Sequence, residues 1–321
     1  MCHPRTDLAL EESERLRAQT GQELPGVSVK EEQEDSITIT RVHIFSREGE
    51  ELMGKVQGNY ITIEAPRLKV RDTEVQEKAA QILARELGGL MQPLYNGGEV
   101  LVVGLGNWQA TPDALGPHVV ENLLITRHLK DYLPKNLGSR LRPVCAVAPG
   151  VLGTTGIESS DIIAGVIQRV RPGLVIVIDA LAARNVERII TSIQLSDTGI
   201  HPGSGVGNRR VGLTRETLGV PVMAIGVPTV VHAITIAANA VDILVRQLGQ
   251  RKEFYGILAS MSGSDKNRLI DEVLSPTVGD LMVTPKEIDV YIEDMARVLA
   301  SGLNAALQPG VSHEELLGFL H

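Results

Sequence analysis

Two aspartates in this chain each follow a short apolar run, and together they can form an acid/base pair. Asp113 ends the stretch over residues 99–113 (EVLVVGLGNWQATPD), and Asp179 ends the stretch over residues 173–179 (GLVIVID). Such runs are typical of buried parallel strands, and in open α/β sheets reacting groups gather just beyond the carboxyl ends of these strands. Two carboxylates that meet there share a proton, so that one activates a water molecule while the other protonates the leaving group.

Each aspartate also has a structural alternative. Asp113 follows Pro112, which restricts the backbone and helps to direct the carboxylate, but an aspartate at this point can equally cap a helix. Asp179 ends five apolar residues, where a carboxylate needs a partner, and Arg184 lies close enough in sequence to be that partner. The residues alone leave both alternatives open.

Other motifs point less clearly to chemistry. His118, beside the TPDALGP loop, and His201, in the glycine-rich loop over residues 198–210, are the histidines expected to line a site, although either can be structural. No HExxH or clustered metal spacing is present, and the strand-following Gly104 and Gly106 lack the third glycine of a dinucleotide loop. We therefore predict neither a metal nor a cofactor.

The composition sets limits on the class of protein. The chain has 321 residues, a formal net charge of -8 and only 3% aromatic residues, so its core must be built from aliphatic side chains. The acidic balance argues against direct contact with nucleic acid. Cys2 and Cys145 form no disulfide or zinc spacing, and no secretory signal is visible, so we expect a cytoplasmic protein. Polar residues interrupt the apolar stretch 220–245, which favours a strand and then a helix from near Thr229 over a membrane span.

The order of elements predicts a three-layer α/β/α sandwich with a mixed, mostly parallel sheet of the phosphorylase/hydrolase-like kind. The core sheet is expected over residues 98–250. A β-hairpin over 36–66 either augments a sheet edge or forms a small flap, and a helix over 74–91 is capped by Asp72 or Thr73. Residues up to Asp35, which end in a charge run, are expected to form a mobile or surface-lying extension, and residues 251–321 a C-terminal helical part.

Seven motifs in order resemble the germination protease family of endospore-forming bacteria, whose members degrade small acid-soluble spore proteins. They are RTDLALE, GNYITIEAP, VVGLGNWQATPDALGP, APGVLGTTGIESSD, VIDALAAR, SDTGIHPGSGVGNRR and GVPTVVHA. The resemblance implies an aspartic-type endopeptidase, related in fold to hydrogenase-maturation peptidases, with its acidic pair at Asp113 and Asp179.

The resemblance also implies an inactive homotetrameric zymogen in the forespore that removes its own N-terminal segment. Family members cut after an acidic residue that precedes a bulky apolar residue and Ala, and Asp7, Leu8 and Ala9 fit this pattern. The expected cut lies between Asp7 and Leu8, leaving residues 1–7 as propeptide and 8–321 as one peptidase domain. This propeptide is shorter than the family pattern, and His232 stands where an acidic residue is expected.

A second hypothesis uses the same carboxylates differently. Asp113 and Asp179 can be ligands in a metal-dependent peptidase, or in a metal- or nucleotide-binding module on a similar sheet. Under either hypothesis we expect no membrane partner.

Overall fold

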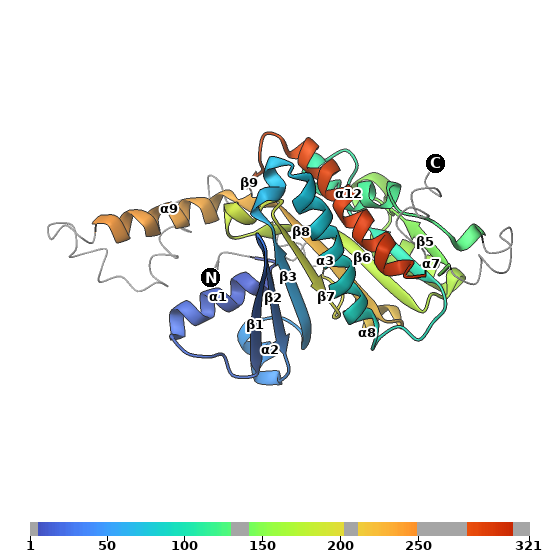
Figure 1. Cartoon of the computed structure of the whole chain (residues 1–321), viewed down its shortest axis with the longest axis horizontal. Helices are drawn as coiled ribbons and strands as arrows, with labels where there is room; N and C mark the ends of the chain where they lie inside the picture. The colour runs from blue at the N-terminus through green and yellow to red at the C-terminus, as the bar shows by residue number, and fades with distance from the viewer. Residues whose placement is uncertain (1–5, 130–140, 202–210, 249–280, 311–321) are drawn as a thin grey trace.

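The computed structural model describes residues 6–129, 141–201, 211–248 and 281–310. Within them the chain forms one mixed sheet in the order β1-β2-β3-β7-β8-β6-β4-β5, with β9 paired to β8. Helices lie on both faces of this sheet (Figure 1). Residues 202–210 of the predicted glycine-rich loop, and residues 251–280 and 311–321 of the predicted C-terminal part, lie outside the described residues.

The parallel half of the sheet consists of aliphatic strands, of which three are buried at almost every residue while the edge strand β5 is buried only in part. These strands are β5 (Val144–Val147), β4 (Val100–Gly104), β6 (Leu174–Ala183) and β8 (Val222–His232). The helix expected from near Thr229 begins only at Ala233, as α9 (Ala233–Leu248), because β8 continues to His232. That continuation matters for the site, since β6 and β8 extend together beyond the end of β4.

The antiparallel half continues the same sheet. Its strands are β7 (Ser192–Ser196), β3 (Gly58–Glu64), β2 (Ile37–Ile44) and β1 (Val27–Glu34), while the short β9 (Met282–Val283) pairs with β8. The mixed sheet is confirmed, but it is not mostly parallel, because five of the described strand pairings are antiparallel and three are parallel. The reason is that the β2–β3 hairpin is not a flap: β3 pairs with β7.

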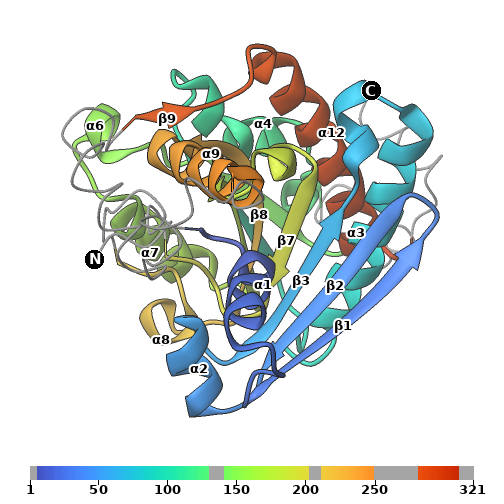
Figure 2. The same ribbon diagram turned by 90° about the vertical axis from the view of Figure 1, so that its left-hand side faces the viewer.

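Two helical layers enclose the sheet. On one face lie α3 (Thr73–Met91), α4 (Leu115–Glu121) and α12 (Ile288–Leu307), whose side chains share one core with the sheet. On the other face, α7 (Ser159–Val170) covers β4 and β6, while α1 (Ala9–Thr20) and α2 (Arg47–Met53) cover β2 and β3. Figure 2 shows α1 and α2 on the side of the sheet opposite α3. The three-layer sandwich is therefore confirmed.

Several shorter helices connect these elements. They are η1 (Pro66–Val70), η2 (Thr111–Asp113), η3 (Arg127–Leu129), α6 (Leu152–Thr155), η4 (Val186–Arg188) and α8 (Arg215–Leu218). The cap expected for α3 is present, since the Asp72 side chain accepts a hydrogen bond from the Val75 amide. None of the helices in the described ranges is long and apolar enough to cross a membrane.

Of the two expectations for the segment up to Asp35, a mobile or a surface-lying extension, the mobile one is wrong for the described residues 6–35. Helix α1 buries Ala9, Leu10 and Leu16, and β1 pairs with β2 along its whole length. The charged residues of β1 are mostly exposed. Charge on an edge strand discourages pairing with other chains, so the run marks the edge of the sheet and not a loose segment.

Candidate active site

A cavity of about 610 Å³ opens where β4 ends and β6 and β8 continue. Asp113 and Asp179 both line this cavity, as does Asp7, which carries the predicted cut on its C-terminal side. The structure therefore brings the predicted acidic pair and the predicted cleavage point into one space.

Asp179 lies inside β6 and not at its end. The last residue of β4, Gly104, pairs with Ile178, so Asp179 is the first residue of β6 beyond the end of β4. Its side chain is 8% exposed and accepts a hydrogen bond from the Ala180 amide at 3.0 Å. The expectation that the strand ends at Asp179 is wrong, yet the residue still lies at the carboxyl edge of a parallel neighbour.

Asp113 is held by the loop that follows β4. The Asn107 amide donates to the Asp113 Oδ2 atom at 2.9 Å and to its carbonyl oxygen at 3.1 Å. Gly106 makes this approach possible, because its φ is +123° and a Cβ there would lie 1.8 Å from the Asp113 carbonyl oxygen. The helix-cap alternative is not observed, since α4 begins after Ala114 without a side-chain cap.

The other predicted site residues separate into two groups. His201 lines the cavity, whereas His118 and Arg184 are not among its described lining residues. His118 packs its ring edge against Trp108, with ring centroids 4.8 Å apart, and its Nδ1 atom is 3.6 Å from Glu121. The Arg184 amide donates to Glu11. His232 ends β8, where it is 8% exposed and pairs with Met282 of β9.

The sequence analysis missed several polar residues of the cavity, three of which carry a charged or amide side chain. Lys55 comes from the loop between α2 and β3, Gln194 from the middle of β7, and Glu158 from the turn before α7. Burial lowers the pKa of the Lys55 amine, against the opposing effect of nearby carboxylates, first of all Asp7. Lys55 stands outside the seven motifs, whereas Glu158 stands in APGVLGTTGIESSD and Gln194 is a polar residue between buried strand positions, which are signals that sequence reasoning can use.

The segment around Asp7 docks on the part of β6 that β4 leaves free. The Asp7 amide donates to the Ala182 carbonyl oxygen at 3.1 Å, and the Ala182 amide donates to the Asp7 Oδ2 atom at 2.9 Å. The Ile178 carbonyl oxygen, four residues earlier on the same edge, accepts from Leu105 just after β4. The N-terminal segment thus takes the place in the sheet that a longer β4 would occupy, as a peptide added to a strand edge does.

The carbonyl oxygen of Asp7 accepts two further hydrogen bonds from side chains. Lys55 Nζ donates to it at 2.9 Å and Gln194 Nε2 at 3.2 Å. The Oε1 atom of Gln194 accepts from the Ala9 amide at 2.7 Å. Side-chain contacts therefore hold the chain on both sides of the Asp7–Leu8 peptide bond.

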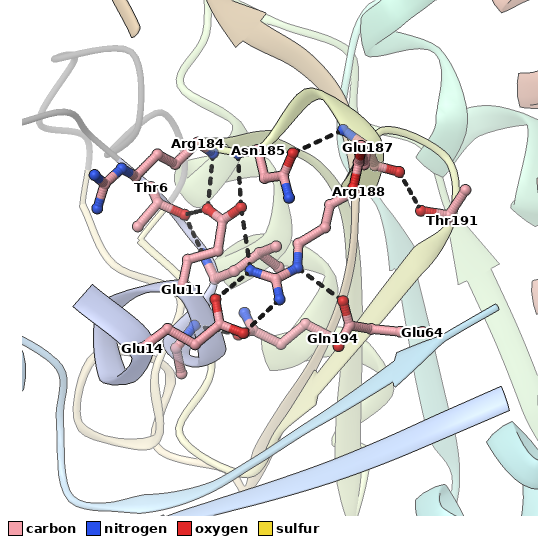
Figure 3. A network of polar contacts seen from close by, with 12 residues as sticks. Thr6, Glu11, Glu14, Glu64, Arg184, Asn185, Glu187, Arg188, Thr191 and Gln194 are labelled. Atoms are coloured by element: carbon pink, nitrogen blue, oxygen red, sulfur yellow. Dashed lines mark hydrogen bonds and ion pairs between the residues drawn. The ribbon is translucent and has the colours of Figure 1, made fainter. Parts of the chain in front are cut away.

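The residues after this bond are anchored by a polar network (Figure 3). Glu11, whose residue is 3% exposed, accepts from the amides of Arg184 and Asn185 at 2.7 and 2.8 Å and also from the Thr6 hydroxyl. The buried Leu8 contributes to the main core. The start of α1 is therefore fixed to the end of β6.

Arg188 connects the two halves of the sheet with α1 through hydrogen bonds and ion pairs. Its guanidinium forms a bidentate pair with Glu14 at 2.7 and 2.6 Å, donates to Glu64 of β3 at 2.8 Å and lies 3.5 Å from Glu11 (Figure 3). Burial opposes the charged form, but the hydrogen bonds to Glu14 and Glu64 outweigh it and raise the pKa of Arg188 above its ordinary value. In the residues that the structure describes, no group of three or more His, Cys, Asp or Glu side chains is arranged to hold a metal ion.

Comparison with known proteins decides the family. The germination protease family matches this chain over residues 5–253 and 247–319, which together span nearly all of it. The chain belongs to the germination protease family. Germination protease from Caldanaerobacter subterraneus subsp. tengcongensis is 54% identical over 321 residues, covering 99% of this chain and 98% of that protein. Germination protease from Bacillus subtilis is 47% identical over 356 residues, covering 99% of this chain and 96% of that protein.

Membership in the germination protease family makes the chain a peptidase associated with germination. Among solved structures, a [NiFe] hydrogenase maturation protease HycI from Thermococcus kodakarensis overlaps with 45% of this chain and 80% of its own, at 20% identity and a TM-score of 0.30. An overlap of this size does not bear on the site of a germination protease.

Proposed function

We propose that this chain is a self-processing endopeptidase that begins the degradation of small acid-soluble spore proteins during germination. It cuts after an acidic residue that precedes a bulky apolar residue and Ala. One observation carries the proposal: Asp7, in an Asp-Leu-Ala sequence, lies in the same cavity as Asp113 and Asp179, with its backbone paired to β6.

The proposed reaction uses Asp113 and Asp179 as a pair that shares one proton. The ionised carboxylate takes a proton from a water molecule, whose oxygen adds to the carbonyl carbon of Asp7. The protonated carboxyl then gives its proton to the nitrogen of Leu8 as the C–N bond breaks. The two carboxyl groups lie in different environments, since Asp179 is 8% exposed inside β6 while Asp113 lies on a half-exposed loop. Such a difference favours a pair in which one carboxyl group is protonated and the other ionised.

The same proposal gives the N-terminal residues their role. Residues 1–7 are the propeptide, residues 8–321 the peptidase domain, and the uncut chain is an inactive homotetramer in the forespore. Membership in the germination protease family supports this assignment. Docking of Asp7 on β6 supports it as well, since a segment in the cavity blocks the entry of other substrates until it is removed.

The test replaces each aspartate by its uncharged isostere. Asp113→Asn and Asp179→Asn should each lower the cleavage of a peptide containing Glu-Leu-Ala by a factor on the order of 10⁴, because the two groups act as a unit. Asp289→Asn is the matched control, since Asp289 is exposed on α12. The thermal unfolding midpoint should stay unchanged in all three variants.

Two results would overturn the proposed mechanism. One is substantial residual cleavage in both site variants. The other is loss of activity in a chelator that a single added metal ion restores, which would assign Asp113 and Asp179 to metal binding.

A further inference from the structure

We infer that Lys55 and Gln194 form the site that binds the carbonyl oxygen of the bond being cut and stabilises the negative charge that this oxygen gains. The inference rests on the proposed function, because it takes Asp7–Leu8 as that bond. Both side chains line the cavity that holds Asp113 and Asp179. They come from the antiparallel half of the sheet, whereas the aspartates come from the parallel half.

The donors converge on a single acceptor. Lys55 Nζ lies 2.9 Å and Gln194 Nε2 lies 3.2 Å from the carbonyl oxygen of Asp7. Two donors on one carbonyl oxygen, fixed before the reaction starts, are the arrangement that stabilises a developing oxyanion in acyl-transfer enzymes. One of them is an ammonium group, which adds a full positive charge where the negative charge appears.

The Asp7 carboxylate accepts a hydrogen bond that a backbone carbonyl of an added strand would otherwise accept. In an ordinary strand pair the Ala182 amide would donate to a backbone carbonyl of its neighbour. Here it donates to the Asp7 Oδ2 atom, while the Asp7 amide still donates to the Ala182 carbonyl oxygen. An acidic residue before the cut therefore holds the segment on β6 through its side chain while its carbonyl oxygen accepts from Lys55 and Gln194, which gives a physical reason for the preference for an acidic residue.

Gln194 also sets the register of the chain across the bond. Its Oε1 atom accepts from the Ala9 amide at 2.7 Å while its Nε2 atom donates to the Asp7 carbonyl oxygen. The amide group cannot reverse this orientation without losing both hydrogen bonds. The carbonyl oxygen therefore meets a donor only when the Asp7–Leu8 bond is in register.

Lys55 is surrounded by acidic groups that favour its charged form. Burial has the larger effect and lowers the pKa of the Lys55 amine, and Asp7, Glu12 and Glu11 oppose this shift. A cation at this position is consistent with the acidic residue Asp7 before the cut, and it would equally attract the acidic residue of another substrate.

The chemical step is balanced with these groups in place. Water adds its oxygen to the Asp7 carbonyl carbon and gives one proton to the ionised aspartate, while the carbonyl π electrons move to the oxygen held by Lys55 and Gln194. The C=O bond then re-forms as the C–N bond breaks. The leaving Leu8 nitrogen takes the proton of the second carboxyl, so the pair ends with one proton, as it began.

The test follows self-processing of the full chain by mass spectrometry. Lys55→Met and Gln194→Glu should each slow the first-order loss of residues 1–7 by about 10²–10³-fold, the effect of removing one oxyanion donor. Gln194→Glu keeps the acceptor for the Ala9 amide and replaces the donor to Asp7 by a carboxylate oxygen, which opposes the developing negative charge. Lys69→Met is the matched control, because Lys69 Nζ also contacts backbone carbonyls, those of Val186 and Glu187, outside the cavity.

A chemical rescue separates a role in the reaction from a role in folding. Lys55→Cys treated with 2-bromoethylamine regains an ammonium group of nearly the same length and should recover at least tenfold in rate over the untreated variant. Wild-type chain treated in the same way controls for alkylation of Cys2 and Cys145.

The outcomes distinguish this inference from the proposed function. If Lys55→Met and Gln194→Glu process within about threefold of wild type while Asp113→Asn and Asp179→Asn do not process, the inference is wrong and the proposed function stands. If alkylation fails to restore the Lys55→Cys rate, or Lys69→Met is equally slow, Lys55 acts only through stability and the inference is also wrong. If both aspartate variants process normally, the proposed function itself fails.

Discussion

The parallel and antiparallel halves of the sheet contribute different side chains to the same cavity. The parallel half supplies acids, Asp113 after β4 and Asp179 within β6, at the edge where β4 ends. The antiparallel half supplies hydrogen-bond donors, Lys55 before β3 and Gln194 on β7. The N-terminal segment lies between these groups, so a bond in it meets both acids and donors. The difference suggests that proton transfer and carbonyl binding are divided between the two halves.

The parallel half should be the more sensitive to a small backbone change. In Gly106→Ala the new Cβ would lie 1.8 Å from the Asp113 carbonyl oxygen, at a backbone φ of +123°. We expect self-processing to slow by at least about 10³-fold, because misplacement of a reacting group by about 1 Å already costs about 10²-fold and this variant adds backbone strain. Intact mass against time measures the rate. Gly165→Ala on α7 is the control, since no atom lies within 4 Å of its added Cβ; equal rates in the two variants would refute this account of Gly106.

The Arg188 ion-pair network, which connects the two halves of the sheet, should contribute to the free energy of unfolding. Arg188→Met leaves the acidic groups around it, including the buried Glu11 and the β3 residue Glu64, without their shared cation. We expect the free energy of unfolding to fall by about 3 kcal/mol, as when one partner of a buried ion pair is removed. Urea denaturation measures it. Arg47→Met, which breaks an exposed pair with Glu51, should change it by less than about 0.5 kcal/mol. A similar small change for Arg188→Met would contradict the role of this network.

The Asp7 carboxylate should increase the self-processing rate more through its hydrogen bond than through its charge. Asp7→Ala removes the acceptor for the Ala182 amide, and we expect self-processing to slow by about tenfold to 100-fold, the usual worth of a hydrogen bond to a charged group. Asp7→Asn keeps an oxygen at that position and should stay within about tenfold of wild type. Equal loss in both variants, seen by mass spectrometry, would show that charge and not hydrogen bonding is recognised.

The antiparallel half should impose an alkaline limit on the reaction. Because burial lowers the pKa of the Lys55 amine, with Asp7, Glu12 and Glu11 opposing the shift, the ammonium loses its proton at a pH below that of an ordinary lysine. The self-processing rate should therefore fall by about tenfold for each pH unit above that pKa. Lys55→Arg should move the fall to higher pH, and Lys55→Met should remove it. An alkaline limb that is unchanged in Lys55→Met would assign it to another group.

The sequence predicts the parallel half of the site better than the antiparallel half, for a physical reason. Asp179 directly follows an apolar run, where a carboxylate is costly enough to be conspicuous, and Asp113 stands in the loop after the other apolar run. The glycines at the end of β4 and just after it are also visible in the sequence, although they allow close backbone approaches, Gly104 to Gly116 and Gly106 to Asp113. The cap of α3 at Asp72 is equally local and was predicted.

Features that depend on contacts distant in sequence were not predicted. Lys55 stands in a polar connection like many others, and only the pairing of β3 with β7 brings its loop to the cavity beside Gln194. Apart from RTDLALE, the N-terminal 35 residues show no signal stronger than charge, although α1 and β1 are elements of the fold. The continuation of β6 beyond Asp179 likewise depends on its partner β8 and not on its own residues.

The most direct test of this account is the intact mass of the full chain during incubation. The wild-type chain should lose residues 1–7 and give a product that begins at Leu8, while Asp113→Asn and Asp179→Asn should keep their full mass over the same time. A wild-type chain that stays uncut, a product that begins elsewhere, or the same cut in both aspartate variants would contradict it.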